Sequence, residues 1–273
     1  MTTPLSTRLR TRLQRSETVA PVALAVTVGA MAATGAIILR WLIRAVQWVF
    51  FDQGSRFGAA FGDSWIGRLN LLLAPAIGMV VVSWMVRRWA PEAQGHGVPE
   101  VQYAIRKLGG RIRARVAAVK ALASAISIGS GGSVGREGPI VQIGSSLGST
   151  VGQIAGLGPG QTRIMVAAGA AGAIAATFTA PIAGVMFAME VILGNFAARS
   201  FGLVVIASVT STAISQAVLG REPAFRLVET FTLVSEWEFL LYLALGVFTG
   251  LIALAYVQSV YWFEDSFEAW KLK

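Results

Sequence analysis

A glycine-rich break between two apolar segments constrains this chain more than any other feature of its sequence. Residues 129–139 read GSGGSVGREGP, and they place one acid, Glu137, between apolar residues 114–128 and a further apolar segment. Proline is favoured in the first turn of a helix, so we predict that a helix begins at Pro139. Glu137 would then lie where unpaired backbone N–H groups and the positive end of a helix dipole converge. Such a place binds anions, and here it carries an anionic side chain of its own.

The composition indicates that this break lies inside a membrane. Of the 273 residues, 55% are hydrophobic and only 14% are charged, whereas soluble domains carry about 25% charged residues. A carboxylate at the centre of a bilayer costs about 2.5–3.5 kcal/mol on insertion scales, so it indicates a functional site. Irregular backbone at that depth must be buried in protein or line a wet cavity.

Two long apolar segments come first, residues 19–51 and 69–89, and each is long enough to cross a bilayer. A basic tail, residues 1–18, precedes the first segment, and a second basic zone, residues 87–115, follows the next one. We expect the protein in the cell membrane. The positive-inside rule then puts the N-terminus and this basic zone on the cytoplasmic side. The net charge of +9 therefore indicates topology and contact with anionic membrane lipid, and we expect no nucleic-acid partner.

The later apolar segments are short and interrupted. They cover residues 98–107, 114–128, 139–155, 161–178, 181–194 and 201–219, and three of them have a proline at or near their start: Pro99, Pro139 and Pro181. After a more polar connector, residues 220–236, one more long helix is predicted from residue 237 to about 262. Broken helices of this kind build transporter sites from helix ends, so the sequence predicts an all-α polytopic membrane protein.

Several kinds of site are excluded by residue counts and spacing. The chain has no cysteine and one histidine, so neither a thiolate nor a histidine metal site is expected. The glycine run lacks the Lys-Ser/Thr ending of a phosphate-binding loop, and the spacing of a metalloprotease or a Ser-His-Asp hydrolase is missing. We therefore expect no enzyme activity, no cofactor and no metal.

Three motifs in this order resemble those of the CLC family, the chloride channels and chloride/proton antiporters. GHGVPEV at residues 95–101 resembles the family's first anion-binding motif, usually Gly-Ser-Gly-Ile-Pro-Glu, and GREGP at residues 135–139 matches the second motif without change. APIAGVMFAME at residues 180–190 resembles the start of the next helix, and Lys120 stands where the family commonly has a lysine.

The resemblance implies a fold of tilted and re-entrant helices in two inverted halves, and a homodimer with one anion pathway per subunit. Residues 19–219 would form the first half and residues 237–273 the first helix of the second half, with the remaining helices absent. Glu137 would be the gate, which occludes the anion site as a carboxylate and swings away when protonated or displaced. The other implied anion-binding residues are Gly95, His96, Gly97, Val98, Pro99, Gly135, Arg136 and Gly138. Lys120 and Arg136 would hold the local potential positive.

Two departures from the family pattern leave the function open. His96 replaces the usual serine, and Val191 stands where proton-coupled members usually have a glutamate directly after the position of Glu190. Since a valine cannot relay a proton, we favour gated, passive chloride conduction, with chloride/proton exchange as the alternative. A third hypothesis is a truncated membrane protein that does not transport, and a structural ion pair of Glu137 with Arg136 or Lys120 is the alternative to a gate. Chloride is the expected anion, and nitrate, bromide and fluoride stay open.

Overall fold

The computed structural model describes residues 19–53, 65–221, 233 and 235–270. It divides the chain into two units, Met1–Phe225 and Arg226–Lys273, and each is described here by itself. The predicted basic tail at residues 1–18 and most of the predicted connector at residues 220–236 lie outside the described residues.

The described part of the first unit is built from helices. In chain order these are α2 (Val19–Gln47), α4 (Trp65–Trp89), α5 (Val98–Lys107), α6 (Arg115–Gly129), α7 (Glu137–Ile154), α8 (Pro159–Phe178), α9 (Pro181–Phe187) and α10 (Ala198–Leu219). A 3-10 turn, η2 (Pro91–Ala93), precedes α5, and π-helical segments η1 (Trp48–Gln53) and η3 (Ala188–Leu193) extend α2 and α9. The all-α prediction is confirmed, and the π-helical segments were not predicted.

The start of the helix that follows the glycine-rich break differs from the prediction. Helix α7 begins at Glu137, so Pro139 is its third residue and not its first. A proline is tolerated there because the N–H groups of the first turn have no acceptor within the helix. Glu137 is therefore part of the first helical turn. Helix α8 likewise begins at Pro159, earlier than the predicted residue 161.

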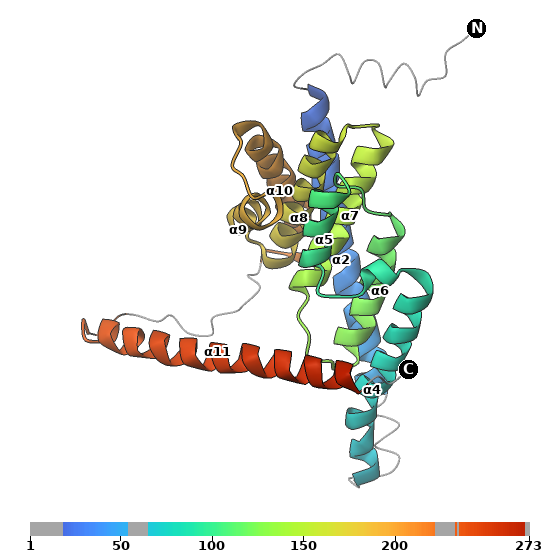
Figure 1. Cartoon of the computed structure of the whole chain (residues 1–273), viewed down its shortest axis with the longest axis vertical. Helices are drawn as coiled ribbons and strands as arrows, with labels where there is room; N and C mark the ends of the chain where they lie inside the picture. Colours follow the sequence, from blue (N-terminus) through green and yellow to red (C-terminus); the bar gives the residue numbers. More distant parts are fainter. Residues whose placement is uncertain (1–18, 54–64, 222–232, 234, 271–273) are drawn as a thin grey trace. The chain divides into compact units, whose positions relative to one another are not determined.

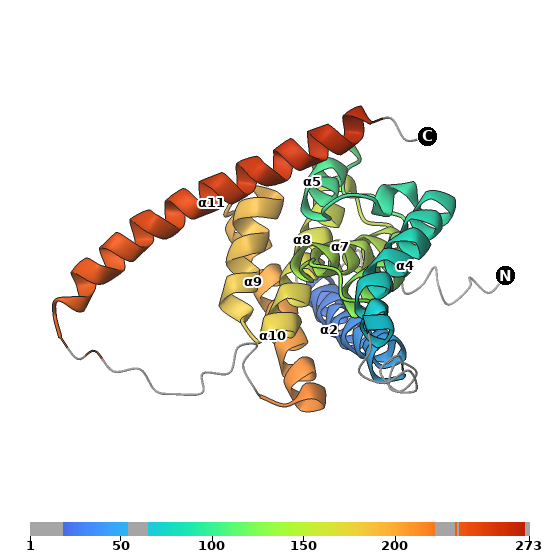
Figure 2. The same ribbon diagram turned by 90° about the horizontal axis from the view of Figure 1, so that it is seen from below.

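Helix α8 is the centre of the first unit and packs against α2, α7 and α10 (Figures 1 and 2). Its buried residues are mostly alanine and glycine, which let neighbouring backbones approach closely. A Cβ atom added to Gly144 of α7 would overlap the carbonyl oxygen of Gly169 on α8, and the reverse also holds. Glycine at both positions, 144 and 169, therefore allows α7 and α8 to approach this closely.

Serine hydroxyls join α10 to α8 and α9. Ser208 donates to the carbonyl oxygen of Pro181 at 2.8 Å, Ser211 to that of Gly172 at 2.6 Å, and Ser215 to that of Ala176 at 2.8 Å. The three serines are spaced by three and four residues, so they lie on one face of α10. Each satisfies its hydroxyl within the helix packing, as polar groups inside a membrane protein must.

The described chain contains both membrane-length helices and much shorter ones. By length and composition, Val19–Asp52, Ala198–Leu219 and Glu238–Phe267 could each cross a membrane. Helix α5 has only 10 residues and α9 has 7, so neither spans by itself. The described part of the second unit forms one helix, α11 (Glu238–Ala269), of 32 residues. It extends beyond the predicted end near residue 262.

Candidate anion site

The first glycine motif forms the turn that enters α5. Gly95 and Gly97 have φ angles of 94° and 101°, which side-chain-bearing residues rarely adopt. Gly97 caps the helix, and its N–H donates to the Glu100 carboxylate at 2.7 Å. This N–H, which we expected to be open to an anion, is therefore already bonded within the motif. His96 lies between the two glycines, and its side chain is exposed.

The second glycine motif leads into α7. Gly131 has a φ of 95°, and the loop then runs to Glu137, the first residue of the helix. The Glu137 side chain is exposed. Its carboxylate lies so close to Gly135 that a Cβ atom on Gly135 would overlap it. Among the residues that the structure describes, no ion pair joins Glu137 to Arg136 or to Lys120.

The two motifs touch backbone to backbone. A Cβ atom on Gly97 would overlap the carbonyl oxygen of Gly138, and one on Gly138 would overlap the carbonyl oxygen of His96. Residues some 40 positions apart thus bring the starts of α5 and α7 together. Two helix N-termini that meet in this way concentrate positive dipole ends at one place.

Lys120 ties α6 to this junction. Its side chain is buried, and its ammonium donates to the carbonyl oxygens of Ala93 at 3.0 Å and of Gly95 at 2.8 Å. The lysine therefore fixes the path of the first motif and brings a positive charge to it.

One cavity of about 630 Å³ collects most of the predicted residues. Of these, it is lined by Gly95, His96, Val98, Lys120, Gly135, Glu137 and Gly138. Gly97 is buried beneath it, and Pro99 faces a different cavity on the far side of α5. Arg136 also lies elsewhere, with its guanidinium 5.3 Å from the centre of the Phe178 ring. The predicted contribution of Arg136 to this cavity is therefore not seen.

The same cavity includes polar residues that sequence reasoning missed. Ser83 and Arg87 of α4, Gln94, and Ser124 and Ser127 of α6 line it. Ser83 and Arg87 are four residues apart, so they share one face of α4. The four-residue spacing was visible in the sequence, but the sequence did not show that this face of α4 lies toward the cavity. Hydroxyl and guanidinium donors suit an anion.

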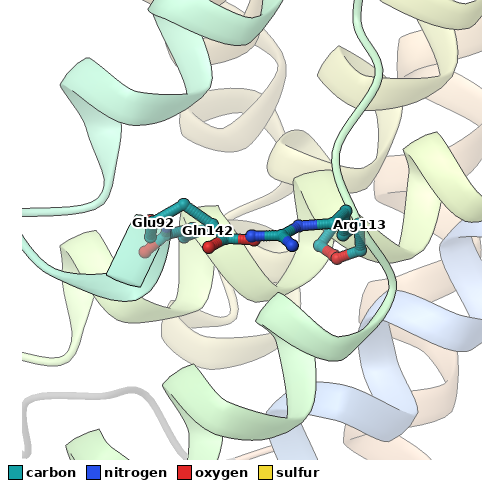
Figure 3. A network of polar contacts seen from close by, with 4 residues as sticks. Glu92, Arg113 and Gln142 are labelled. Carbon is teal, nitrogen blue, oxygen red and sulfur yellow. The ribbon is translucent and has the colours of Figure 1, made fainter. Parts of the chain in front are cut away.

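A polar network outside the cavity connects the loops on which the site rests (Figure 3). Gln142 of α7 donates to the backbone oxygen of Glu92 at 3.0 Å, and the Glu92 carboxylate pairs with Arg113 in the loop before α6. Ser146, also on α7, donates to the backbone oxygen of Arg113 at 3.1 Å. Helix α7 is thereby attached to both the turn before the first motif and the start of α6.

The position expected to relay protons in coupled relatives has no ionisable side chain here. Val191 lies in η3, and its backbone oxygen accepts a hydrogen bond from the Gln102 side chain of α5 at 2.7 Å. Glu190, its neighbour, is exposed. The pair that joins α5 to η3 is therefore an amide and a carbonyl, and neither of them titrates.

A glycine-lined cavity between helix starts, inside a bundle of long and broken helices, defines a candidate intramembrane anion site. The chain belongs to the family described as the voltage gated chloride channel family, which matches residues 78–273. It is 32% identical over 252 residues to the H(+)/Cl(-) exchange transporter ClcA of Klebsiella pneumoniae, a match that covers 89% of this chain and 51% of that protein. It is also 32% identical over 218 residues to chloride channel protein CLC-f of Arabidopsis thaliana, covering 76% of this chain and 26% of that protein.

Solved structures show the same fold. A slow cyanobacterial Cl-/H+ antiporter superposes with a TM-score of 0.69 at 23% identity, covering 86% of this chain and 54% of the antiporter. A CLC-type fluoride/proton antiporter superposes with a TM-score of 0.63 at 22% identity, covering 92% of this chain and 57% of that one. The chain thus spans about half the length of the Klebsiella relative and of these two antiporters, and about a quarter of the Arabidopsis protein. The CLC-type fold predicted from the motifs is confirmed.

Proposed function

We propose that this chain is part of a multi-pass membrane protein that conducts chloride, with Glu137 as the gate of the anion pathway. The observation that carries the proposal is that both glycine motifs, Lys120 and Glu137 line one cavity. The Glu137 carboxylate lies exposed at the first turn of α7, without an ion pair to Arg136 or Lys120 in the described residues. An acid in that state can leave or enter the site without breaking a salt bridge.

The surroundings of this pathway follow from the same reading. We propose that the protein works as a homodimer in the cell membrane, with its N-terminus in the cytoplasm and lipid around its apolar helices. Chloride is the favoured substrate, and other small anions are candidates because the fluoride/proton antiporter shares the fold. No catalytic step, cofactor, metal or nucleic acid is part of the proposal.

The gate is tested by replacing Glu137 with glutamine in the full-length protein. The amide has the shape of the protonated acid but cannot ionise, so Glu137→Gln should leave chloride flux intact and remove its dependence on pH. Chloride flux into proteoliposomes, measured over a series of pH values, gives the result. A pH dependence identical to that of the unsubstituted protein would refute the assignment.

The second candidate function is chloride/proton exchange. It is favoured by the names of the Klebsiella relative and the structural neighbours, which are proton-coupled transporters. We favour passive conduction because Val191 stands where coupled members usually have a glutamate, and because the Gln102 amide and the Val191 backbone carbonyl, which join α5 to η3, do not titrate.

A chloride gradient across proteoliposomes distinguishes the two functions. If conduction is passive, the gradient should drive little uphill proton movement. Val191→Glu would supply a titratable group next to Gln102, and it provides a comparison for weak coupling. Stoichiometric proton pumping by the unsubstituted protein would show exchange, and would direct attention to Glu190 as the inner relay.

A further inference from the structure

A second cavity, separate from the anion site, lies between the last turns of α2 and the residue that precedes α7. Its volume is about 280 Å³. Arg40, Arg44 and Gln47 of α2 line one part, and Arg136 and Thr177 line another. The remaining wall consists of aliphatic side chains from α2, α6, α8 and α10. We call it the arginine cavity.

The charged side chains that line the arginine cavity are arginines. Arg44 of α2 and Arg136 before α7 line it from two segments, and its lining among the described residues contains no aspartate or glutamate. The Arg136 guanidinium lies over the Phe178 ring at 5.3 Å, which positions its plane while its edges stay able to donate. Like charges gathered at one cavity repel each other, so an anion placed between them would be stabilised.

We propose that the arginine cavity binds a phosphate group, either the headgroup of an anionic lipid or free phosphate, between Arg44 and Arg136. A guanidinium fork matches the oxygens of phosphate, and several oxygens on one group can engage two arginines at once. The cavity is also far larger than the roughly 30 Å³ share of one water, so a lone chloride ion would leave most of it to solvent.

The aliphatic wall of the cavity suits an apolar group attached to the phosphate. Leu39, Ile43 and Leu219 line the cavity beside the arginines, so a phosphate that carries an apolar group would bury that group there. Arg136 directly precedes Glu137, the first residue of α7. A bound phosphate would therefore hold the start of that helix in place. The binding itself does not depend on the proposed chloride conduction.

The test measures how fast phenylglyoxal modifies individual arginines, with the full chain in nanodiscs of phosphatidylcholine, which leave both faces open. Peptide mass spectrometry follows Arg44, and Arg106 serves as a control in the same molecule because it is exposed on α5 and does not line the cavity. Phenylglyoxal reaches Arg44 only when the cavity is empty. Inorganic phosphate at about nine times its dissociation constant should therefore lower the rate of Arg44 modification about tenfold. Sodium chloride at the same ionic strength and pH should not slow it.

Two further arms identify the source of the phosphate and the second arginine. If Arg44 reacts slowly in nanodiscs that contain phosphatidylglycerol, without added phosphate, the ligand is a lipid headgroup; protection by inorganic phosphate alone indicates the free anion. Arg136→Gln should weaken protection of Arg44, whereas Arg106→Gln should leave it unchanged.

The comparison of phosphate with chloride needs no variant, so the proposal is tested even if Arg136→Gln fails to fold. Equal slowing by chloride, equal slowing at Arg106, or no slowing in any arm would overturn it. None of these outcomes depends on ion flux, so failure here leaves the proposed conduction standing.

Discussion

Glycines let the two anion motifs meet at the scale of single atoms. Gly97 and Gly138 each lie where a Cβ atom would overlap a backbone oxygen of the other motif. Side chains then complete the junction, since Lys120 bonds the carbonyls of Ala93 and Gly95 from a buried position. His96 is the exception, because it is exposed and lies in the cavity itself. The glycines and the lysine therefore hold the backbone of the site in place, whereas the side chains of His96 and Glu137 are exposed in the cavity.

His96 should therefore affect anion choice more than stability. One hydrogen bond contributes about 0.5–1.5 kcal/mol, so His96→Ala should change the ratio of chloride to nitrate permeability by up to about tenfold. Removing an exposed side chain should change the free energy of unfolding by no more than about 0.5 kcal/mol. Flux assays in proteoliposomes and thermal unfolding measure the two quantities, with Lys107→Ala at the exposed end of α5 as the control. An unchanged permeability ratio in a folded protein would mean that His96 takes no part in selection.

At the scale of helices, close crossings hold the broken segments in position. Helices α7 and α8 approach at Gly144 and Gly169, and α2 approaches α10 where a Cβ atom on Gly29 would overlap the carbonyl oxygen of Ala207. Lipid tails are as apolar as side chains, so such helices associate through close packing and hydrogen bonds. The position of the gate helix is thus set by the small residues on its partners.

The crossing of α7 and α8 predicts opposite effects for two glycine substitutions. Gly144→Ala places a methyl group against the Gly169 carbonyl oxygen and Ala173, and overpacking of this kind costs about 1–3 kcal/mol. Gly160→Ala is the matched control, since nothing lies within 4 Å of a Cβ atom there. It should be neutral or slightly stabilising because alanine is the better helix former. Thermal unfolding in nanodiscs should separate the two, and equal midpoints would contradict the tight crossing.

At the scale of the whole molecule, the chain corresponds to only part of its relatives. It spans 51% of the Klebsiella relative and 54% of the cyanobacterial antiporter. A pathway between inverted repeats takes residues from both of them. The described cavity contains the motifs of the first half only, so we expect conduction to require helices of the kind that the relatives carry beyond the matched region.

Reconstitution of this 273-residue chain by itself should therefore give chloride flux no higher than empty liposomes. Adding the C-terminal half of a relative as a separate polypeptide should restore part of the flux, and Glu137→Gln in the same mixture should remove its pH dependence. Fluorescence-quench measurements of chloride entry provide the comparison. Strong flux from the single chain that depends on Glu137 would show that these helices build a pathway unaided.

Local properties of the sequence determined the class of protein, most helix positions and the motif residues. Apolar length predicts which segments form membrane helices, and the Gly- and Pro-rich stretches such as residues 129–139 mark where they break, so these features need no knowledge of distant residues. Some boundaries differed from the prediction, including the start of α8 and the end of α11. At α7 the reason is that a proline fits anywhere in a first turn and does not specify its own place.

Only the tertiary structure decided which way the polar side chains face. It places Arg136 over Phe178 and in the arginine cavity, away from the cavity that holds Glu137, although the two residues are adjacent in sequence. It brings Ser83 and Arg87 of α4 into the anion site and joins Gln102 to Val191 across 89 residues. The direction in which a side chain points depends on the orientation of its helix about the helix axis. That orientation is set by close packing between segments far apart in the chain.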